Sequence, residues 1–357
     1  MDLDRILKVA VRGGASDVLL KTGVMPRFRF NGDIIQLSDG QEITVEIMSD
    51  WVSRILPEHL RSRLETRGDA DFAYQSLDGN RFRGHVFKQR QTFSLVFRVI
   101  TQHIRSMEEL QLPKILKRLS DEKRGLVLVT GATGSGKSTT LAAMVQRINK
   151  ERSAHVVTIE DPIEFLFTDQ MSTIQQREIG IDAESFASAL HGAMRQNPDV
   201  ILVGELRDQN TIETALMAAE TGHLVLSTLH TTDAAETLTR MLSYFPPHQH
   251  AVLRQMIAST LKAVISQRLV SRVDGKARVA AFEILVNNAT VRDHILKNGN
   301  FEDLHSIIAH SGDAYGMQTF DDSLFGLYKA GIISAEQALA QATKRDNMHL
   351  KMRGVGT

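Results

Sequence analysis

One stretch of this chain restricts its possible folds more than any other: residues 131–138, which read G-A-T-G-S-G-K-S. The stretch fits the pattern G-x-x-x-x-G-K-[ST], follows an apolar run at 125–130 and opens a helical pattern at 137–150. Glycines let consecutive backbone N–H groups turn inward around a phosphate, and a helix N-terminus adds partial positive charge. The order strand, loop, helix therefore predicts an α/β fold with a phosphate-binding turn.

The same loop supplies side chains for a nucleotide and a metal ion. Lys137 is expected to reach the β and γ phosphates, and the Ser138 hydroxyl is expected to bind Mg²⁺. The residues expected to contact the phosphates are Thr133, Gly134, Ser135, Gly136, Lys137, Ser138 and Thr139. A glycine-rich turn without a ligand is the alternative, but both side chains and both flanking elements are those that the motif requires. We therefore expect ATP and Mg²⁺ to be bound.

A second apolar strand, at 199–204, is followed by the carboxylate Glu205. In phosphate-transfer sites a carboxylate at such a place orients and polarises the attacking water. Gly204 stands where many proteins with this element carry an aspartate that binds Mg²⁺. A solvated glutamate at a strand end is the alternative interpretation of Glu205.

Three carboxylates, Glu160, Asp161 and Glu164, lie at and just beyond the end of another strand, at 155–160. The ends of parallel strands gather at the edge where the phosphate loop lies, so these groups are candidates to hold Mg²⁺ and its waters. A solvated turn explains the cluster equally well. His230 follows a buried strand at 224–228 and is a candidate sensor of the γ-phosphate or a bridge to a neighbouring subunit. A hydrogen-bonded structural histidine is the alternative.

Three arginines lie outside the region of the phosphate loop. Arg81 and Arg83 are two residues apart, on one face of a predicted strand at 81–87, and Arg98 ends the strand-like segment 92–98. Arginines so placed suit a role as fingers that neutralise charge building on a γ-phosphate. Spacing alone favours an ordinary charged sheet face.

Length and pattern divide the 357 residues into two domains. Residues 1–100 hold short alternating strands and a helical stretch at 45–65 that Pro57 should break, which predicts a small α+β domain with an antiparallel sheet. Residues 101–113 are a plausible linker. From 114 to 357, apolar strands alternate with helical segments, which predicts a mainly parallel, helix-covered sheet and a mostly helical part from about residue 286.

Composition excludes several classes of protein. Lys+Arg and Asp+Glu both number 42, and this balance argues against a protein that coats nucleic acid by bulk charge. The absence of cysteine excludes disulfides, thiolate catalysis and cysteine-based zinc sites. No apolar run approaches the roughly 18 to 20 residues of a membrane span, so we expect a cytoplasmic protein.

Four stretches together resemble the type IV pilus retraction ATPases, the PilT/PilU family of the secretion ATPase superfamily. They are the phosphate loop at 131–139, the acidic stretch at 158–164, the strand end at 197–207 and the histidine stretch at 221–230. Segments at 14–17, 81–83, 96–98 and 316–321 also look like this family, so the similarity covers nearly the whole chain.

The resemblance implies a PAS-like N-terminal domain and a RecA-like ATPase domain, assembled as a homo-hexamer. It implies that Glu205 is the catalytic carboxylate and that ATP is bound between subunits. The residues that would complete this site are Glu160, Glu164, His230, Arg83, Arg98 and Arg81. It further implies a motor that pulls pilin subunits out of the fibre, powers twitching motility and contacts a platform protein at the inner-membrane base of the pilus machine.

One departure from the family leaves an alternative open. The retraction ATPases often carry a late motif A-I-R-N-L-I-R-E, and residues 290–297 read T-V-R-D-H-I-L-K here, so that Arg292 and Ile295 match. A PilU-like accessory ATPase, with a paralogous retraction ATPase as a partner, is therefore the second interpretation. A pilus-assembly or type II secretion ATPase is less favoured, because the four-cysteine motif and extra N-terminal domain of those proteins are missing. A nucleic-acid translocase and a nucleotide switch without turnover are the remaining alternatives.

Overall fold

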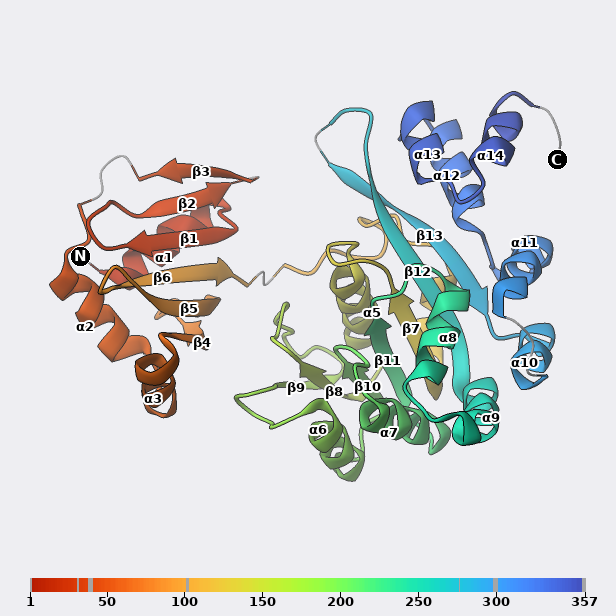
Figure 1. Cartoon of the computed structure of the whole chain (residues 1–357), viewed down its shortest axis with the longest axis horizontal. Helices are drawn as coiled ribbons and strands as arrows, with labels where there is room; N and C mark the ends of the chain where they lie inside the picture. Colours follow the sequence, from red (N-terminus) through yellow and green to blue (C-terminus); the bar gives the residue numbers. More distant parts are fainter. Residues whose placement is uncertain are drawn as a thin grey trace. The chain divides into compact units, whose positions relative to one another are not determined.

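The computed structural model describes residues 2–30, 32–37, 41–100, 103–275, 277–297 and 301–354 (Figure 1). It divides into two compact units: Met1–His103 with Glu164–Leu166, and Ile104–Ile163 with Phe167–Thr357. Thr101 and Gln102 of the expected linker lie outside the described residues.

The first unit is built on a six-stranded antiparallel sheet in the order β3-β2-β1-β6-β5-β4. Its strands are β1 (Asp17–Lys21), β2 (Arg27–Phe30), β3 (Asp33–Gln36), β4 (Asp69–Gln75), β5 (Arg81–Gln89) and β6 (Thr92–Val99). Its helices are α1 (Leu3–Gly13), α2 (Val45–Ile55) and α3 (Glu58–Arg67). The α+β unit with an antiparallel sheet expected from the sequence is confirmed.

Local sequence sets the limits of α2 and α3. The Thr44 hydroxyl accepts a hydrogen bond from the Ile47 backbone N–H and caps the start of α2. Pro57 stands between the two helices, where a proline cannot continue the backbone hydrogen bonds of α2, and α3 begins directly after it. The break expected at Pro57 is therefore confirmed.

The two faces of this first sheet differ in character. Alternate residues of β5, Phe82, Gly84 and Val86, point into the core, where the Phe82 and Phe97 rings meet edge to face. A Cβ atom at Gly84 would lie 2.4 Å from the Phe72 ring, so glycine makes room for that aromatic side chain. The opposite face of β5 presents polar side chains to solvent, among them Arg83.

The second unit is built on a seven-stranded sheet in the order β13-β12-β7-β11-β10-β8-β9. Its strands are β7 (Gly125–Thr130), β8 (His155–Glu160), β9 (Thr173–Glu178), β10 (Val200–Val203), β11 (Leu224–Leu229), β12 (Leu261–Ser271) and β13 (Arg278–Val286). All neighbours are parallel except β12 and β13. The mainly parallel sheet is confirmed. The antiparallel β13 was not expected, and neither were β9 and β12.

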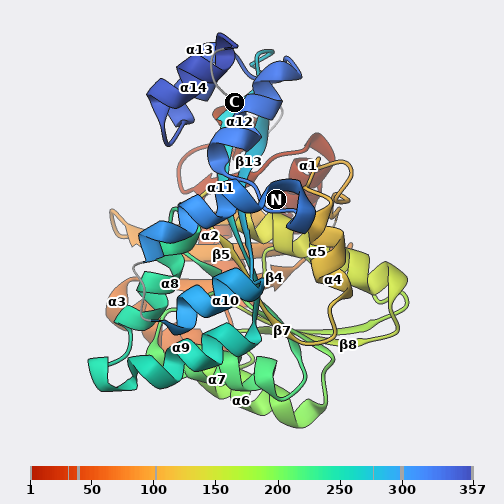
Figure 2. The same ribbon diagram turned by 90° about the vertical axis from the view of Figure 1, so that its right-hand side faces the viewer.

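Helices cover both faces of this second sheet. One face packs on α4 (Ile115–Asp121) and α5 (Lys137–Glu151). The other packs on α6 (Phe186–Ala193), α7 (Gln209–Glu220), α8 (Ala234–Ser243) and α9 (His250–Thr260). In Figure 2, β7 and β8 run between α4 and α5 on one side and α6, α7 and α9 on the other. Because both faces are buried, the strands are continuous apolar runs, which is why they are easy to recognise in the sequence.

From residue 289 the second unit is helical, as expected. The helices are α10 (Ala289–Leu296), α11 (Leu304–Tyr315), α12 (Phe320–Lys329), α13 (Ala335–Gln341) and α14 (Arg345–Met352). The last three form a small core of their own against β12 and β13, with Phe320, Leu324 and Met348 at its centre. Across the described part of the chain, no helix is both long and apolar enough to cross a membrane.

Candidate functional site

Glycines shape the turn between β7 and α5. Gly131, Gly134 and Gly136 have φ angles of 142°, 78° and 92°, a region that other residues rarely adopt. A Cβ atom at Gly131 would lie 2.4 Å from the Gln267 backbone oxygen and 2.6 Å from Ser135 Oγ. Lys137 begins α5, so the turn leads directly into a helix N-terminus. The strand, loop and helix that the motif requires are therefore present.

The side chain of Gln267, in β12, holds this turn in place through hydrogen bonds. This role of Gln267 was not recognised from the sequence. Its Nε2 atom donates to the Ser135 backbone oxygen at 2.7 Å, and its Oε1 atom accepts from the Thr140 hydroxyl at 2.8 Å. The residue is only 3% exposed. One side chain thus ties the loop and the first turn of α5 to a neighbouring strand. The polar pair Ser266-Gln267 inside an apolar run is the signal in the sequence that marks it.

Lys137, His230 and Glu205 come together at the carboxyl ends of adjacent strands. Lys137 Nζ donates to the Gly131 and Ala132 carbonyl oxygens at 2.8 and 3.2 Å and lies 3.4 Å from His230 Nδ1. His230 Nε2 lies 3.5 Å from Glu205 Oε2. Because β7, β11 and β10 are neighbours in the sheet, the residues that follow them meet at one edge.

The chain of polar contacts continues beyond Glu205. Glu205 Oε1 forms an ion pair with Arg207 Nη2, and Arg207 Nη1 lies 3.4 Å from Asp161 Oδ2. The Glu205 side chain is 14% exposed, so this carboxylate is not a solvated strand end. Sequence reasoning placed Arg207 in a family-like stretch but gave it no role. Its second partner, Asp161, lies 46 residues earlier in the chain, and the sequence alone does not place the two side by side.

Burial, together with the nearby charge of Lys137, lowers the pKa of His230 below 6.5, although Glu205 opposes this shift. This shift favours the neutral ring of His230. A neutral ring with its proton on Nε2 fits both contacts, because Nδ1 then accepts from Lys137 and Nε2–H points to Glu205. His230 thus joins the lysine to the carboxylate without adding a charge.

The two other expected carboxylates lie in different surroundings. Glu160 ends β8, is 9% exposed, and accepts hydrogen bonds from the Thr158 hydroxyl at 2.7 Å and from Gln176 at 3.1 Å. These bonds hold it against its own strand and against β9. Glu164 is exposed and belongs to the short stretch grouped with the first unit. That the two join Lys137 and Glu205 in one site remains a prediction.

Close packing explains the glycine that precedes Glu205. A Cβ atom at Gly204 would lie 3.3 Å from the Ile159 backbone oxygen and 3.5 Å from the Glu160 Cα. The Gly204 N–H also donates to that same oxygen at 2.8 Å. A side chain at 204 would therefore lie in close contact with the end of β8, which favours glycine at this position.

The residues at the loop fit a magnesium ion bound together with phosphates. The buried Ser135 Oγ finds no hydrogen-bond partner among the described residues, and Ser138 lies in the first turn of α5. Within the same part of the chain, no group of three or more His, Cys, Asp or Glu could hold a metal ion. Mg²⁺ commonly takes one or two protein ligands and fills its shell with phosphate oxygens and water. That Ser138 is the protein ligand of such an ion remains a prediction.

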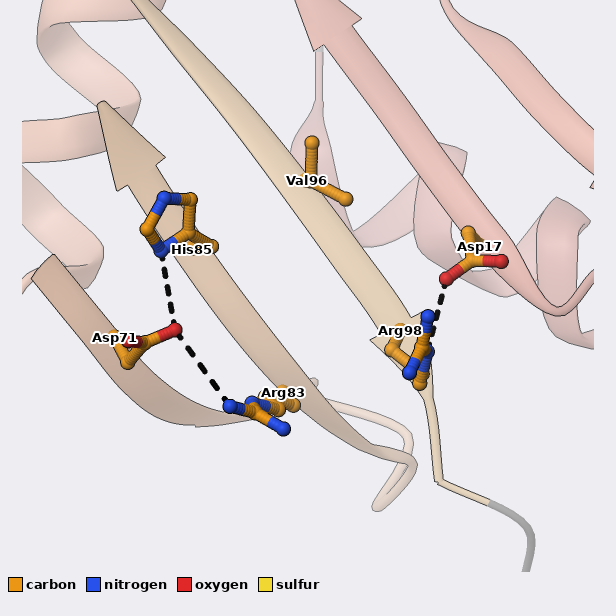
Figure 3. Close-up of a pocket in the computed structure, with 6 residues that line it drawn as sticks. All are labelled: Asp17, Asp71, Arg83, His85, Val96 and Arg98. Atoms are coloured by element: carbon orange, nitrogen blue, oxygen red, sulfur yellow. Dashed lines mark hydrogen bonds and ion pairs between the residues drawn. The ribbon is translucent and has the colours of Figure 1, made fainter. Parts of the chain in front are cut away.

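The three arginines belong to the first unit, where two of them line a pocket of about 280 Å³ (Figure 3). Arg83 and Arg98 are directly opposite each other on β5 and β6. Arg98 Nε donates to Asp17 Oδ1 at 3.0 Å, whereas Arg83 Nη2 is 4.0 Å from Asp71 Oδ1. Arg81 lies two residues before Arg83 in β5 and does not line the pocket. The structure brings two of the arginines together but assigns all three to a different unit from Lys137.

Comparisons with known proteins cover nearly the whole chain. Residues 2–305 match the family described as "Type II/IV secretion system protein". The type IV pilus retraction ATPase PilT of Pseudomonas aeruginosa is 41% identical over 97% of this chain and 100% of its own length. The type IV pilus ATPase PilU of the same organism is 38% identical over 99% and 92%. A crystal structure of the pilus retraction motor PilT with bound ADP has a TM-score of 0.89 and 39% identity, covering 97% of this chain and 98% of that one.

The contacts of His230 predict how two substitutions change its pKa. Lys137→Ala removes a positive charge that lowers the pKa of His230, so this pKa should rise. Glu205→Gln removes the carboxylate that opposes the shift, so the pKa should fall further. An NMR titration of labelled histidine, with His230→Asn to assign the signal, measures both. Shifts in the same direction in the two variants would show that His230 does not lie between opposite charges.

Proposed function

This chain belongs to the PilT/PilU group of pilus retraction ATPases within the type II/IV secretion system protein family, and on that premise we propose that it is the ATP-hydrolysing motor of pilus retraction. The observation that carries the proposal is the contact of Lys137 with Glu205 through His230 at the end of the phosphate loop. This contact supports the proposal that a phosphate-binding cation and a water-orienting carboxylate act at the same sheet edge.

The chemistry follows from these side chains. Lys137 exchanges its carbonyl partners for the β and γ phosphates of ATP, while backbone N–H groups of the loop and of the start of α5 bind the phosphate oxygens. Ser138 would hold Mg²⁺, which neutralises phosphate charge when bound. Glu205 orients the attacking water, and neutral His230 keeps the carboxylate and the lysine at a fixed separation. Glu160 and Glu164 are proposed to complete the site on the side of β8.

We propose that the arginines of the first unit complete the site of a second copy of the chain. Arg83 and Arg98 occupy paired positions on an exposed sheet face and line one pocket, an arrangement that offers two guanidinium groups to the three charged oxygens of a γ-phosphate. Arg81 is proposed as a further contact. A ring in which each copy supplies arginines to its neighbour closes as a homo-hexamer, the assembly that the family resemblance implies.

The cellular role proposed here is the removal of pilin subunits from a type IV pilus, which powers twitching motility. The partners are then a platform protein at the inner-membrane base of the pilus machine and, in the PilU-like alternative, a paralogous retraction ATPase. The motor would act from the cytoplasmic side, attached peripherally to that base. Identities of 41% to PilT and 38% to PilU do not favour the accessory role over the main one.

Mixed assemblies test whether the site is shared. A copy with Glu205→Ala cannot hydrolyse the nucleotide that it binds. A copy with Arg83→Ala cannot supply this arginine to the nucleotide site of its neighbour. In an equal random mixture, about a quarter of the interfaces pair an intact Glu205 with an intact Arg83. Phosphate release from co-expressed variants should therefore exceed that of either variant alone. A mixture no more active than its two components would contradict a site shared between copies.

Deletion of the gene tests the cellular role. Cells should keep their pili but lose retraction and twitching, and the wild-type gene should restore both while Lys137→Ala should not. Retraction that fails only under load, or only when a second retraction ATPase is also missing, would identify the accessory role. Loss of the pili themselves would overturn retraction in favour of assembly.

A further inference from the structure

Arg207 lies between the two acidic elements of the second unit. Its Nη2 atom pairs with Glu205 Oε1, and its Nη1 atom lies 3.4 Å from Asp161 Oδ2. The backbone that carries Arg207 is fixed, because the neighbouring Leu206 is buried and its N–H donates to the Thr228 carbonyl oxygen at 3.0 Å. The guanidinium group therefore spans from the end of β10 to the turn after β8.

The burial of the partners separates this arrangement from an ordinary surface ion pair. The side chain of Arg207 is 56% exposed and that of Asp161 is 40% exposed, and exposed pairs of that kind contribute little. Glu205, at 14%, is largely withdrawn from water, so its two oxygens depend on directed partners. Glu205 Oε1 is paired with Arg207, and Glu205 Oε2 lies 3.5 Å from Nε2 of the neutral His230 ring. Together these contacts fix the rotation of the carboxylate.

We propose that Arg207 is a positioning residue for Glu205, held by Asp161 so that the carboxylate faces the attacking water. The inference rests on the proposed function of Glu205. The planar guanidinium group suits the task, because its in-plane N–H groups bind two carboxylates on different elements. The hydrogen bond to Glu205 raises the pKa of Arg207, so the group stays charged at every working pH.

A direct contact of Arg207 with phosphate is the competing role, and nucleotide affinity separates the two. A positioning residue changes turnover and leaves ATP binding to the loop, whereas a phosphate ligand changes both. The loop keeps its own cation, Lys137, whose Nζ donates to the Gly131 and Ala132 carbonyl oxygens. Arg207→Ala should therefore lower kcat roughly ten- to a hundredfold, the effect of a misplaced catalytic group, with no change in ATP affinity.

Conservative and chemical variants sharpen the test. Arg207→Lys keeps the positive charge but loses the two parallel N–H donors of guanidinium, so its kcat should stay close to that of Arg207→Ala. Asp161→Asn should lower kcat less than Arg207→Ala, because Arg207 still pairs with Glu205 in that variant. Added guanidinium, below denaturing concentrations, should partly restore Arg207→Ala and leave Glu205→Ala inactive. Arg272→Ala, which breaks an exposed pair with Asp274 in the β12–β13 hairpin, is the matched control. Each variant is measured for phosphate release at saturating Mg²⁺ and ATP and for equilibrium ATP binding.

The outcomes distinguish this inference from the proposed function. A loss of ATP affinity in Arg207→Ala as large as in Lys137→Ala would assign Arg207 to phosphate binding. An unchanged kcat in both Arg207→Ala and Asp161→Asn would overturn the positioning role while Glu205→Ala stays inactive. Normal turnover in Glu205→Ala would instead refute the role proposed for that carboxylate. If Arg207→Ala fails to fold, Arg207→Lys and Asp161→Asn decide the question.

Discussion

The ammonium group of Lys137 sits at the edge of the second sheet with only 8% of the residue exposed, and its hydrogen bonds to Gly131 and Ala132 balance the loss of water around it. This one interaction sets the requirements on its surroundings. The loop must turn tightly enough to present its carbonyls to its own lysine, which explains the glycines. A neighbouring strand must also hold the loop in place, and Gln267 of β12 does so by a hydrogen bond to the Ser135 backbone oxygen. Phosphates would replace those carbonyls with stronger, charged acceptors.

A second consequence is that the resting site is neutralised by its own side chains. Going outward from Lys137, the order is cation, neutral His230, anionic Glu205, cationic Arg207 and anionic Asp161. Alternating charges in a partly buried site attract one another, so each group has a preferred place before any ligand arrives. Preorganised groups of this kind lower the reorganisation that a reaction otherwise requires. The arginine pocket of the first unit repeats the principle, with Arg98 held by Asp17.

How much of this was predictable depends on whether the signal is local. The phosphate loop, the buried parallel strands and the helix break at Pro57 were predicted correctly, because each is fixed by a few consecutive residues. The strand β12 was missed because α9 ends at Thr260 and β12 begins at Leu261, with no turn residue to mark the change. Gln267 and Arg207 were missed for a different reason: Gln267 contacts Ser135 and Thr140, and Arg207 contacts Asp161, all of which lie far from them along the chain. A single sequence gives no register for such contacts.

The central claim is that a complete nucleotide site needs two copies of the chain. Its most direct test is the rate of Mg²⁺-dependent phosphate release from ATP, measured over a range of protein concentrations with Lys137→Ala as the inactive control and sedimentation to report assembly. The shared site predicts that activity per copy rises as the copies assemble and vanishes in the monomer. A constant activity per copy, down to concentrations at which the protein is monomeric, would contradict it.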